Sequence, residues 1–183
     1  MSFLVSALTA SLAAVLPLSA VTGQDVTIEE TFRAAGSLPA HQAVTFDTEA
    51  VPLGSKVTVT ERVGDDTHVE LRIHGVEANR TFGAHVHRNP CGGKPNDSGS
   101  HYQNAVDPEQ PSTNPAYAGP RNEVWLDITT DHHGDGASAS TVEWRFRTGQ
   151  ARSVVIHKHA THTGTGTAGT AGARLACVNV PFQ

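Results

Sequence analysis

The sequence predicts an all-β protein, a sandwich or barrel built from short strands. Low Leu and Lys content together with abundant Thr and Val favours strands over helices. Alternation with a period of two recurs in segments such as Lys56–Thr60 and His68–Val76, and turn signals rich in Gly, Pro and Asp separate these segments. The length of 183 residues is enough for one domain with a hydrophobic core and hardly enough for two.

The first 23 residues are predicted to be a signal peptide. Ser2 to Gly23 holds no charged residue and is dominated by Leu, Ala, Val and Ser, and Leu18-Ser19-Ala20 supplies small residues for cleavage. Pro17 and the polar residues make this stretch a poor membrane span. Residues 24–40 lack periodicity, so we expect an N-terminal arm without regular structure, apart from a short turn of helix over Thr31–Ala35. The remaining residues, 41–183, are predicted to form the domain.

The expected strands follow one another from Gln42 onward. Two segments between them lack a strand pattern, the Pro-rich segment 102–122 and the Gly/Thr/Ala segment 164–172, and both are expected to be loops. The second loop lacks the Gly-Lys-Ser/Thr ending of a phosphate-binding loop, so nucleotide binding is not expected. The expected strands are 43–46, 56–60, 68–76, 81–87, 123–130, 137–146, 151–157 and 174–180, with a turn at 64–66 and a hairpin turn at 131–136.

One stretch, Phe82 to His101, carries a pattern typical of a metal site. His85 and His87 are two residues apart, so in a strand both imidazoles lie on the same face, and His101 follows after a polar loop. Neutral imidazole is the commonest nitrogen ligand for copper and zinc. The spacing therefore predicts a metal half-site, with a solvent-exposed histidine pair as the alternative. The other histidines of the strands and turns, His74, His132 and His133, are expected at the surface.

The charge and the cysteines restrict the class of protein further. A net charge of −5 argues against nucleic-acid binding, which needs a basic surface. Cys91 and Cys177 are the only cysteines, and in an exported protein such a pair predicts a disulfide, whereas in the cytosol both would be free thiols. A bridge across so long a loop stabilises by about 4–5 kcal/mol in the chain-entropy model.

Several short motifs occur in a specific order along the chain. They are Gly83-Ala84-His85-Val86-His87, Cys91, Gly99-Ser100-His101, Val154-Val155-Ile156-His157 and Gly172-Ala173-Arg174-Leu175-Ala176-Cys177. From about His41 to the C-terminus, this order resembles the copper/zinc superoxide dismutase family. The resemblance implies a Greek-key β-sandwich, or flattened barrel, of about eight antiparallel strands with long functional loops. It also implies a disulfide between Cys91 and Cys177.

The resemblance assigns a role to each motif residue. It implies that copper is held by four histidines and that Arg174 stands over the open copper position, where its guanidinium docks the superoxide anion. It also implies that His101 is catalytic, because in the family this histidine releases copper on reduction and takes up a proton. His159 and His162 are alternatives for the fourth ligand, although the motif favours His157. The implied ligands are His85, His87, His101 and His157.

The sequence departs from the family where the zinc ligands should be. No histidine occurs from Tyr102 to Asp131, and Arg121 and Val124 stand where the last zinc-binding His and the Asp should be. The loop between His157 and Arg174 is short and has no acidic residue. These departures resemble the copper-only branch of the family, so we expect copper without zinc. His101 then needs another hydrogen-bond partner, and we expect a carboxylate within about 3 Å of its ring. The candidates are Glu123, Glu109 and Asp107.

The sequence thus predicts an exported antioxidant enzyme, a copper-dependent superoxide dismutase that is secreted to the extracellular space or the cell envelope, such as a periplasm. Superoxide is the expected substrate, and neither nucleic acid nor a membrane span of the mature chain is expected. Two alternatives stay open: a copper-binding or structural domain of the same fold without turnover, and a full copper/zinc enzyme with zinc ligands relocated to the segment Asp107–Asp127. The oligomeric state is not predicted.

Overall fold

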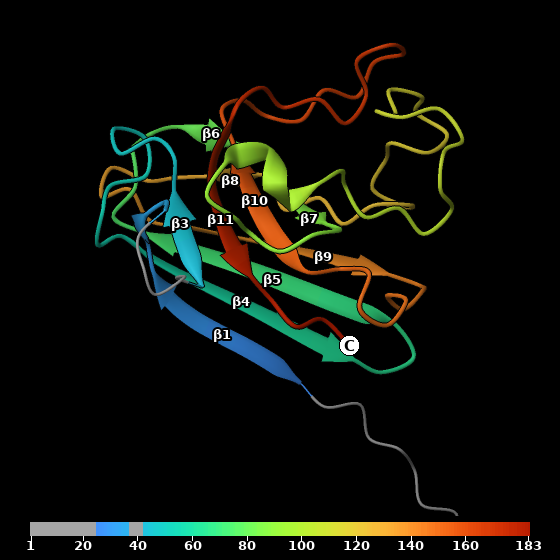
Figure 1. Ribbon diagram of the computed structural model, residues 1–183, viewed down its shortest axis with the longest axis horizontal. Coiled ribbons are helices and arrows are strands. Elements are labelled where there is room, and N and C mark those ends of the chain that lie inside the picture. The colour runs from blue at the N-terminus through green and yellow to red at the C-terminus, as the bar shows by residue number, and fades with distance from the viewer. Residues whose placement is uncertain (1–24, 37–41) are drawn as a thin grey trace, which may run out of the picture.

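The computed structural model describes residues 25–36 and 42–183, and the expected signal peptide over residues 1–23 lies outside the described residues. The chain forms two main sheets with the hydrophobic core between them (Figure 1). Within the described residues, no helix is long and apolar enough to span a membrane. The elements are β1 Val26–Thr31, β2 Arg33–Ala34, β3 Ala43–Thr45, β4 Lys56–Val63, β5 Thr67–His74, β6 Thr81–Phe82, β7 Ala84–His87, the 3-10 helix η1 Pro95–Ser98, β8 Ile128–Thr129, β9 Gly136–Val142, β10 Ser153–His157 and β11 Arg174–Asn179.

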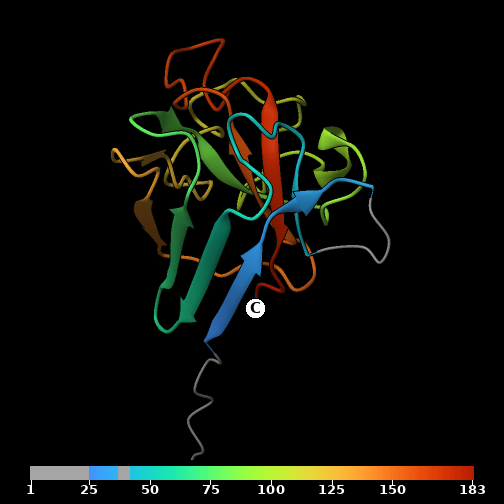
Figure 2. The ribbon, with the colours of Figure 1, turned by 90° about the vertical axis from the view of Figure 1, so that its left-hand side faces the viewer.

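The sheet topology confirms the expected all-β sandwich. One sheet has the strand order β1-β4-β5-β9 and is antiparallel throughout, and Figure 2 shows β1, β4 and β5 side by side in one layer. The second sheet has the order β2-β3-β11-β10-β7, in which only the pair β2–β3 is parallel. Strands β6 and β8 form a small third sheet.

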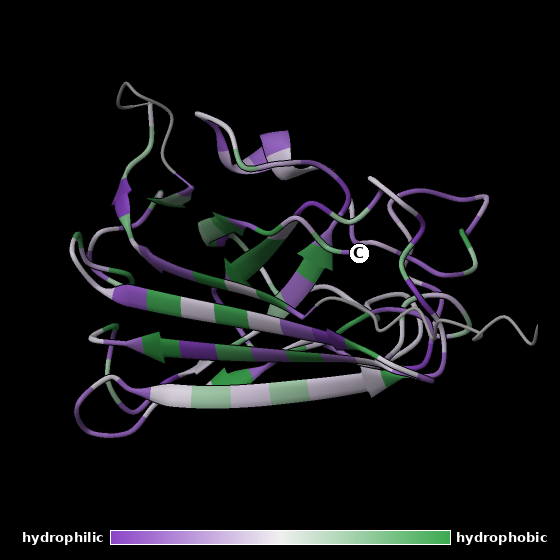
Figure 3. Cartoon of the chain, turned by 90° about the horizontal axis from the view of Figure 1, so that it is seen from below, coloured by the Kyte–Doolittle hydropathy of each residue, from purple (hydrophilic) through white to green (hydrophobic). Residues whose placement is uncertain are grey.

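The period-two pattern places the core on one side of each long strand. In Figure 3, hydrophobic and hydrophilic residues alternate along these strands. Val57 and Val59 of β4 and Leu71 and Ile73 of β5 are at most 1 % exposed and belong to one hydrophobic cluster. Since side chains of a strand alternate between faces, this alternation buries one face of the sheet and leaves the other to solvent.

Strand β7 uses both of its faces, and this positions the histidine pair. Ala84 and Val86 lie in the main core, so His85 and His87 leave the opposite face of the second sheet. That face is covered as well, because both histidines are fully buried. Loops over the outer face of the second sheet therefore enclose the candidate metal ligands.

The expected N-terminal arm without regular structure is wrong for its described residues. Val26–Thr31 forms β1, which pairs with β4 from Val26 opposite Glu61 to Thr31 opposite Lys56. No helical turn forms after it, because Phe32 is fully buried and its backbone N–H donates to the carbonyl of Ser55 at 2.9 Å. The sequence pattern did not predict this strand, because the run Glu29-Glu30-Thr31 breaks the alternation of apolar and polar residues that begins with Val26 and Ile28.

Three expected strands are interrupted or strongly shortened in the structure. The segment 81–87 is interrupted at Gly83, whose backbone N–H donates to the carbonyl of His159 at 2.8 Å. The segment 123–130 keeps only β8 and an isolated bridge between Trp125 and His85. The expected return strand 137–146 ends at Val142, and it is no hairpin partner of segment 123–130, because β9 pairs with β5 and β8 pairs with β6. At Gly83 a contact with a loop far away in sequence replaces strand pairing, while segment 123–130 runs beside β7 with only irregular backbone hydrogen bonds, such as that from Val86 N–H to the carbonyl of Val124.

Glu61, a buried carboxyl on β4, makes stability depend on pH. It is fully buried; its Oε2 accepts a hydrogen bond from the backbone N–H of Gln183 at 2.9 Å, while Oε1 has no partner. Burial raises the pKa of Glu61 from its ordinary value of 4.5 to about 7, against a smaller lowering by the Gln183 bond. The unfolded chain therefore ionises first as the pH rises, and stability is lost through this window.

We expect Glu61→Gln to remove this loss of stability. Between about pH 4.5 and about pH 8, the unfolding free energy of the variant should rise relative to the wild type by up to about 3 kcal/mol, because only the wild type buries a charge at high pH. Denaturant unfolding of both proteins at the two pH values measures this. A difference between variant and wild type that does not change with pH would contradict the assignment.

Candidate metal centre

Four histidines from three parts of the chain meet beside the outer face of the second sheet. His85 and His87 come from β7, His101 is joined to His87 by an isolated bridge, and His157 is the last residue of β10. One ring nitrogen of each lies within 4.8 Å of one ring nitrogen of every other. Among the residues that the structure describes, this is the one group of three or more His, Cys, Asp or Glu side chains so arranged. The structure thus brings together the histidines that the sequence motifs singled out.

Hydrogen bonds to backbone carbonyls orient two of the rings, those of His87 and His157. Nδ1 of His87 lies 3.0 Å from the carbonyl of Gly99, and Nδ1 of His157 lies 3.3 Å from the carbonyl of Gly172. Since a carbonyl only accepts, each Nδ1 carries the proton and each Nε2 has a free lone pair. The two Nε2 atoms are 3.3 Å apart. These rings therefore present Nε2 lone pairs to the space between the histidines.

His85 is turned the other way. Its Nε2 lies 2.7 Å from the hydroxyl oxygen of Thr161, while its Nδ1 is buried and has no hydrogen-bond partner. An unpartnered polar atom in a buried position is costly, and a metal ion would satisfy it. His85 thus offers its Nδ1 where His87 and His157 offer Nε2, and imidazole nitrogens such as these suit transition metals, copper and zinc among them.

Burial favours the neutral form of three of the imidazoles, those of His85, His87 and His157. Burial, followed by the nearby His101, lowers the pKa of both His85 and His87 well below the usual 6.5. The same causes lower the pKa of His157 to about 3. Neutral imidazole is the form that binds a metal, so these three rings can bind a metal at neutral pH without losing a proton first.

The sequence predicted that one of three acids contacts His101, and in the structure this acid is Glu123. Its Oε2 lies 2.8 Å from Nδ1 of His101, and the side chain is 1 % exposed. Gln103 Nε2 donates to Oε1 at 2.8 Å and Trp125 Nε1 donates to Oε2 at 2.7 Å. The other two candidates are engaged elsewhere or exposed: Asp107 accepts a hydrogen bond from Ser112, and Glu109 lies at the surface.

The positions expected for the missing zinc ligands hold residues of other kinds. Arg121 is exposed, and its carbonyl accepts a hydrogen bond from Trp144 Nε1 at 2.8 Å. Val124 is 1 % exposed and packs in the main core. Nδ1 of His101 faces Oε2 of Glu123.

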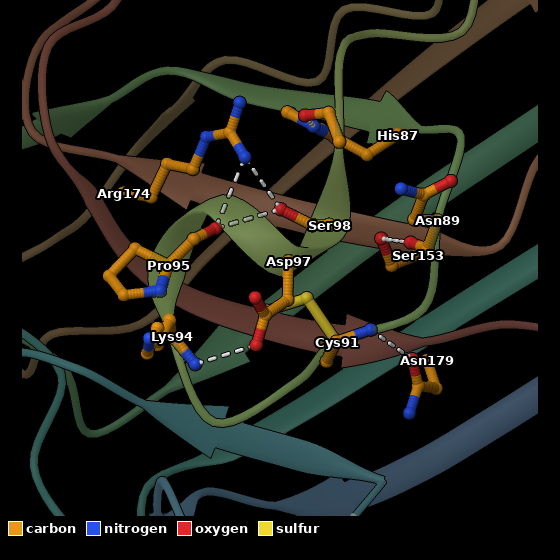
Figure 4. Close-up of a disulfide and its surroundings, with 12 residues drawn as sticks. His87, Asn89, Cys91, Lys94, Pro95, Asp97, Ser98, Ser153, Arg174 and Asn179 are labelled. Atoms are coloured by element: carbon orange, nitrogen blue, oxygen red, sulfur yellow. Dashed lines mark hydrogen bonds between the residues drawn. A yellow bond between two sulfur atoms is a disulfide. The ribbon is translucent and has the colours of Figure 1, made fainter.

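Arg174 lies at the edge of the histidine group. It is the residue opposite His157 across β10 and β11, and its Nη1 donates to the carbonyl of Pro95 at 3.1 Å and to Ser98 Oγ at 2.9 Å (Figure 4). Burial lowers the pKa of Arg174 from 12.5, but a guanidinium stays charged in proteins. Arg174, His101 and His157 line one cavity of about 320 Å³.

A disulfide between Cys91 and Cys177 fixes this arrangement. The structure contains the bridge, with a Cα–Cα distance of 5.7 Å, as the motifs imply. Figure 4 shows it beside η1, whose Pro95 and Ser98 hold Arg174. Because Cys177 belongs to β11, the bridge attaches the loop of η1 to the strand that carries Arg174.

The other histidines that the structure describes lie outside the group. His159 and His162, the alternatives for the fourth ligand, are exposed on the loop after β10. His74, His132 and His133 are exposed as well, as expected. Sequence reasoning missed Thr161 and Trp125, which contact His85, and Gln103, which contacts Glu123. Neither a motif nor a period marks these residues, since only the fold brings their loops to the histidines.

Comparison with known proteins agrees with this fold. Residues 54–180 match the family model of copper/zinc superoxide dismutase (SODC). The fold is similar to that of the Cu/Zn superoxide dismutase from Brucella abortus, with a TM-score of 0.54 and 19 % identity over 86 % of this chain and 99 % of that one. No curated protein sequence matches the chain.

Two further solved structures share the fold. One is a double mutant of a SOD-like protein from Bacillus subtilis, with a TM-score of 0.52 and 17 % identity over 71 % of this chain and 92 % of that one. The other is the clock protein EA4, with a TM-score of 0.51 and 17 % identity over 87 % of this chain and 94 % of that one. The fold therefore also occurs in proteins described by names other than superoxide dismutase.

Proposed function

Because this chain belongs to the copper/zinc superoxide dismutase family, we propose that it is an exported, copper-dependent superoxide dismutase that works without zinc. The observation that carries the proposal is the histidine group, in which one ring nitrogen of each histidine lies within 4.8 Å of one ring nitrogen of every other, beside a half-buried arginine. Copper held by His85, His87, His101 and His157 would supply the one-electron couple that oxidises one superoxide to dioxygen and reduces a second, with two protons, to hydrogen peroxide.

The residues around the site support the binding of a small anion. Arg174 is charged, lines the cavity shared with His101 and His157, and is held in place by η1. Guanidinium nitrogens bind anionic oxygen well, and a positive charge at the mouth of a site raises the rate at which anions reach it. We assign docking of superoxide to this guanidinium.

We assign proton handling to His101. It is the most exposed of the four rings, with 17 % of its side chain accessible, and it lines the cavity with Arg174. Its Nδ1 keeps its proton and donates a hydrogen bond to Glu123, so its Nε2 is the atom that takes up and releases a proton. The buried Glu123, with three donors around it, holds the ring in the orientation that this role needs.

The same contact supports the absence of zinc. A nitrogen that donates its proton to a carboxylate has no lone pair for a second metal ion, and Nδ1 of His101 is such a nitrogen. Export is supported by the disulfide between Cys91 and Cys177, since such bridges persist in oxidising compartments. The uncharged first 23 residues fit a signal peptide.

Metal analysis and a superoxide assay test the proposal together. Protein purified from an oxidising compartment and loaded with copper should hold one copper and no zinc per chain and should disproportionate superoxide. His85→Ala is the control, which should lose both copper and activity. One zinc per chain alongside copper would contradict the zinc-less assignment. Full copper occupancy without turnover would instead show a copper-holding domain of the same fold.

A further inference from the structure

The loop after β10, residues 158–173, packs directly against the candidate copper site. At Gly83, a side chain would place its Cβ only 2.6 Å from Ala171 Cβ and from the carbonyl oxygen of His159, and 3.1 Å from Thr161 Oγ1. The glycine thus permits a close approach of this loop to the strand that carries His85. The approach brings Thr161 within hydrogen-bond distance of the His85 ring.

Asp127 holds Thr161 with two hydrogen bonds. The backbone N–H of Thr161 donates to Oδ2 at 2.7 Å, and its hydroxyl donates to Oδ1 at 2.5 Å. Oδ1 also accepts from the backbone N–H of Ala84 at 3.3 Å. Asp127 Oδ1 is 4.0 Å from Nε2 of His85, too far for a hydrogen bond, so Thr161 mediates between the carboxylate and the ring.

This arrangement determines the tautomer of His85. A hydroxyl has one proton to donate. The Thr161 hydroxyl donates it in the hydrogen bond to Asp127, because a carboxylate can only accept. Toward Nε2 of His85, at 2.7 Å, the hydroxyl oxygen is therefore the acceptor and the ring nitrogen carries the proton. The lone pair then lies on Nδ1, the buried atom without a partner.

We propose that Thr161, held by Asp127, is a positioning residue that locks His85 in the Nε2–H tautomer and so presents its Nδ1 to the metal. The inference rests on the proposed copper site and deepens it. A carbonyl or a carboxylate fixes each of the other three rings. His85 alone depends on a hydroxyl, and that hydroxyl belongs to the loop after β10, so the docking of this loop is part of metal binding.

Substitutions at Thr161 separate this role from simple packing. Thr161→Val keeps the shape and removes the hydroxyl; we expect copper(II) affinity, measured by competition with a chelator, to fall about 10–100-fold and the copper EPR spectrum to change. Thr161→Ser restores the hydroxyl and should restore both. Thr163→Val, at an exposed position of the same loop, is the matched control and should leave both unchanged. Wild-type affinity and an unaltered EPR spectrum in Thr161→Val would overturn the inference.

A measurement on the wild type keeps the inference testable if Thr161→Val does not fold. In the full chain loaded with diamagnetic copper(I), nitrogen-detected NMR of the His85 ring should find the proton on Nε2. A proton on Nδ1 would refute the assigned role of Thr161 whatever the activity. A wild type that shows Nε2–H and the expected Thr161 effects but fails to disproportionate superoxide would reject the proposed function and leave this inference standing.

Discussion

Replacement of His157 by alanine is expected to lower copper-dependent dismutation more than about 100-fold, since even loss of a hydrogen-bond partner of a ligand costs about 10–100-fold. His159→Ala, two residues further along, is expected to change the rate by no more than about twofold, the size of a typical surface effect. The two histidines are a matched pair. Both belong to the same His-x-His sequence, and only one of them lies in the histidine group.

The expected difference arises where β10 ends. The register of β10 and β11 shifts between Ile156 and His157, and the regular alternation of faces stops there. His157 is 4 % exposed, with its Nε2 at 3.3 Å from that of His87. His159 follows on the loop, where its backbone N–H donates to the carbonyl of Ala171 at 2.9 Å and its side chain is exposed.

Copper content and the rate of superoxide loss measure the prediction. His157→Ala should bind copper weakly as well as losing activity, whereas His159→Ala should match the wild type in both. Thermal unfolding of the two metal-free variants serves as the folding control. A fully active His157→Ala, or an inactive His159→Ala with native stability, would show that the fourth ligand is wrongly assigned.

Residue periodicity was enough to predict part of this site. The two-residue spacing of His85 and His87 needs only strand geometry to place both rings on one face. The same spacing could not choose between His157 and His159, because the choice depends on the register shift that ends β10. Periodicity therefore identifies ligands inside a strand and fails at its end.

The partners of the ligands depend on long-range contacts. The sequence offered three acids for His101, and Glu123 is the one in contact because its segment runs beside β7, with the carbonyl of Val124 accepting from the backbone N–H of Val86 at 3.2 Å. No sequence pattern indicated that Thr161 contacts the site, since it is one of several threonines in a Gly/Thr/Ala loop. Strand β1 was missed for a related reason, because pairing with β4 compensates for its weak pattern.

Replacement of Arg174 by glutamine is expected to lower kcat/KM about 10-fold or more at low ionic strength while copper stays bound. Electrostatic attraction raises the rate of anion arrival by about 10–1000-fold, and this guanidinium lines the cavity with His101 and His157. Within the described part of the chain, only Nη1 has protein partners, so Nε and Nη2 remain for the anion. Arg174→Lys keeps the positive charge but lacks the planar guanidinium. Its kcat/KM should lie between that of the wild type and that of Arg174→Gln.

The dependence on salt distinguishes charge from packing in this experiment. The wild-type rate should fall as ionic strength rises, since salt screens the attraction between Arg174 and superoxide, and the rate of Arg174→Gln should fall much less steeply. Arg174 touches Pro95 and Ser98, so a variant that only loosened η1 would lose copper or stability and keep the wild-type salt dependence. Equal salt slopes for wild type and Arg174→Gln, at equal copper content, would show that another group attracts the anion.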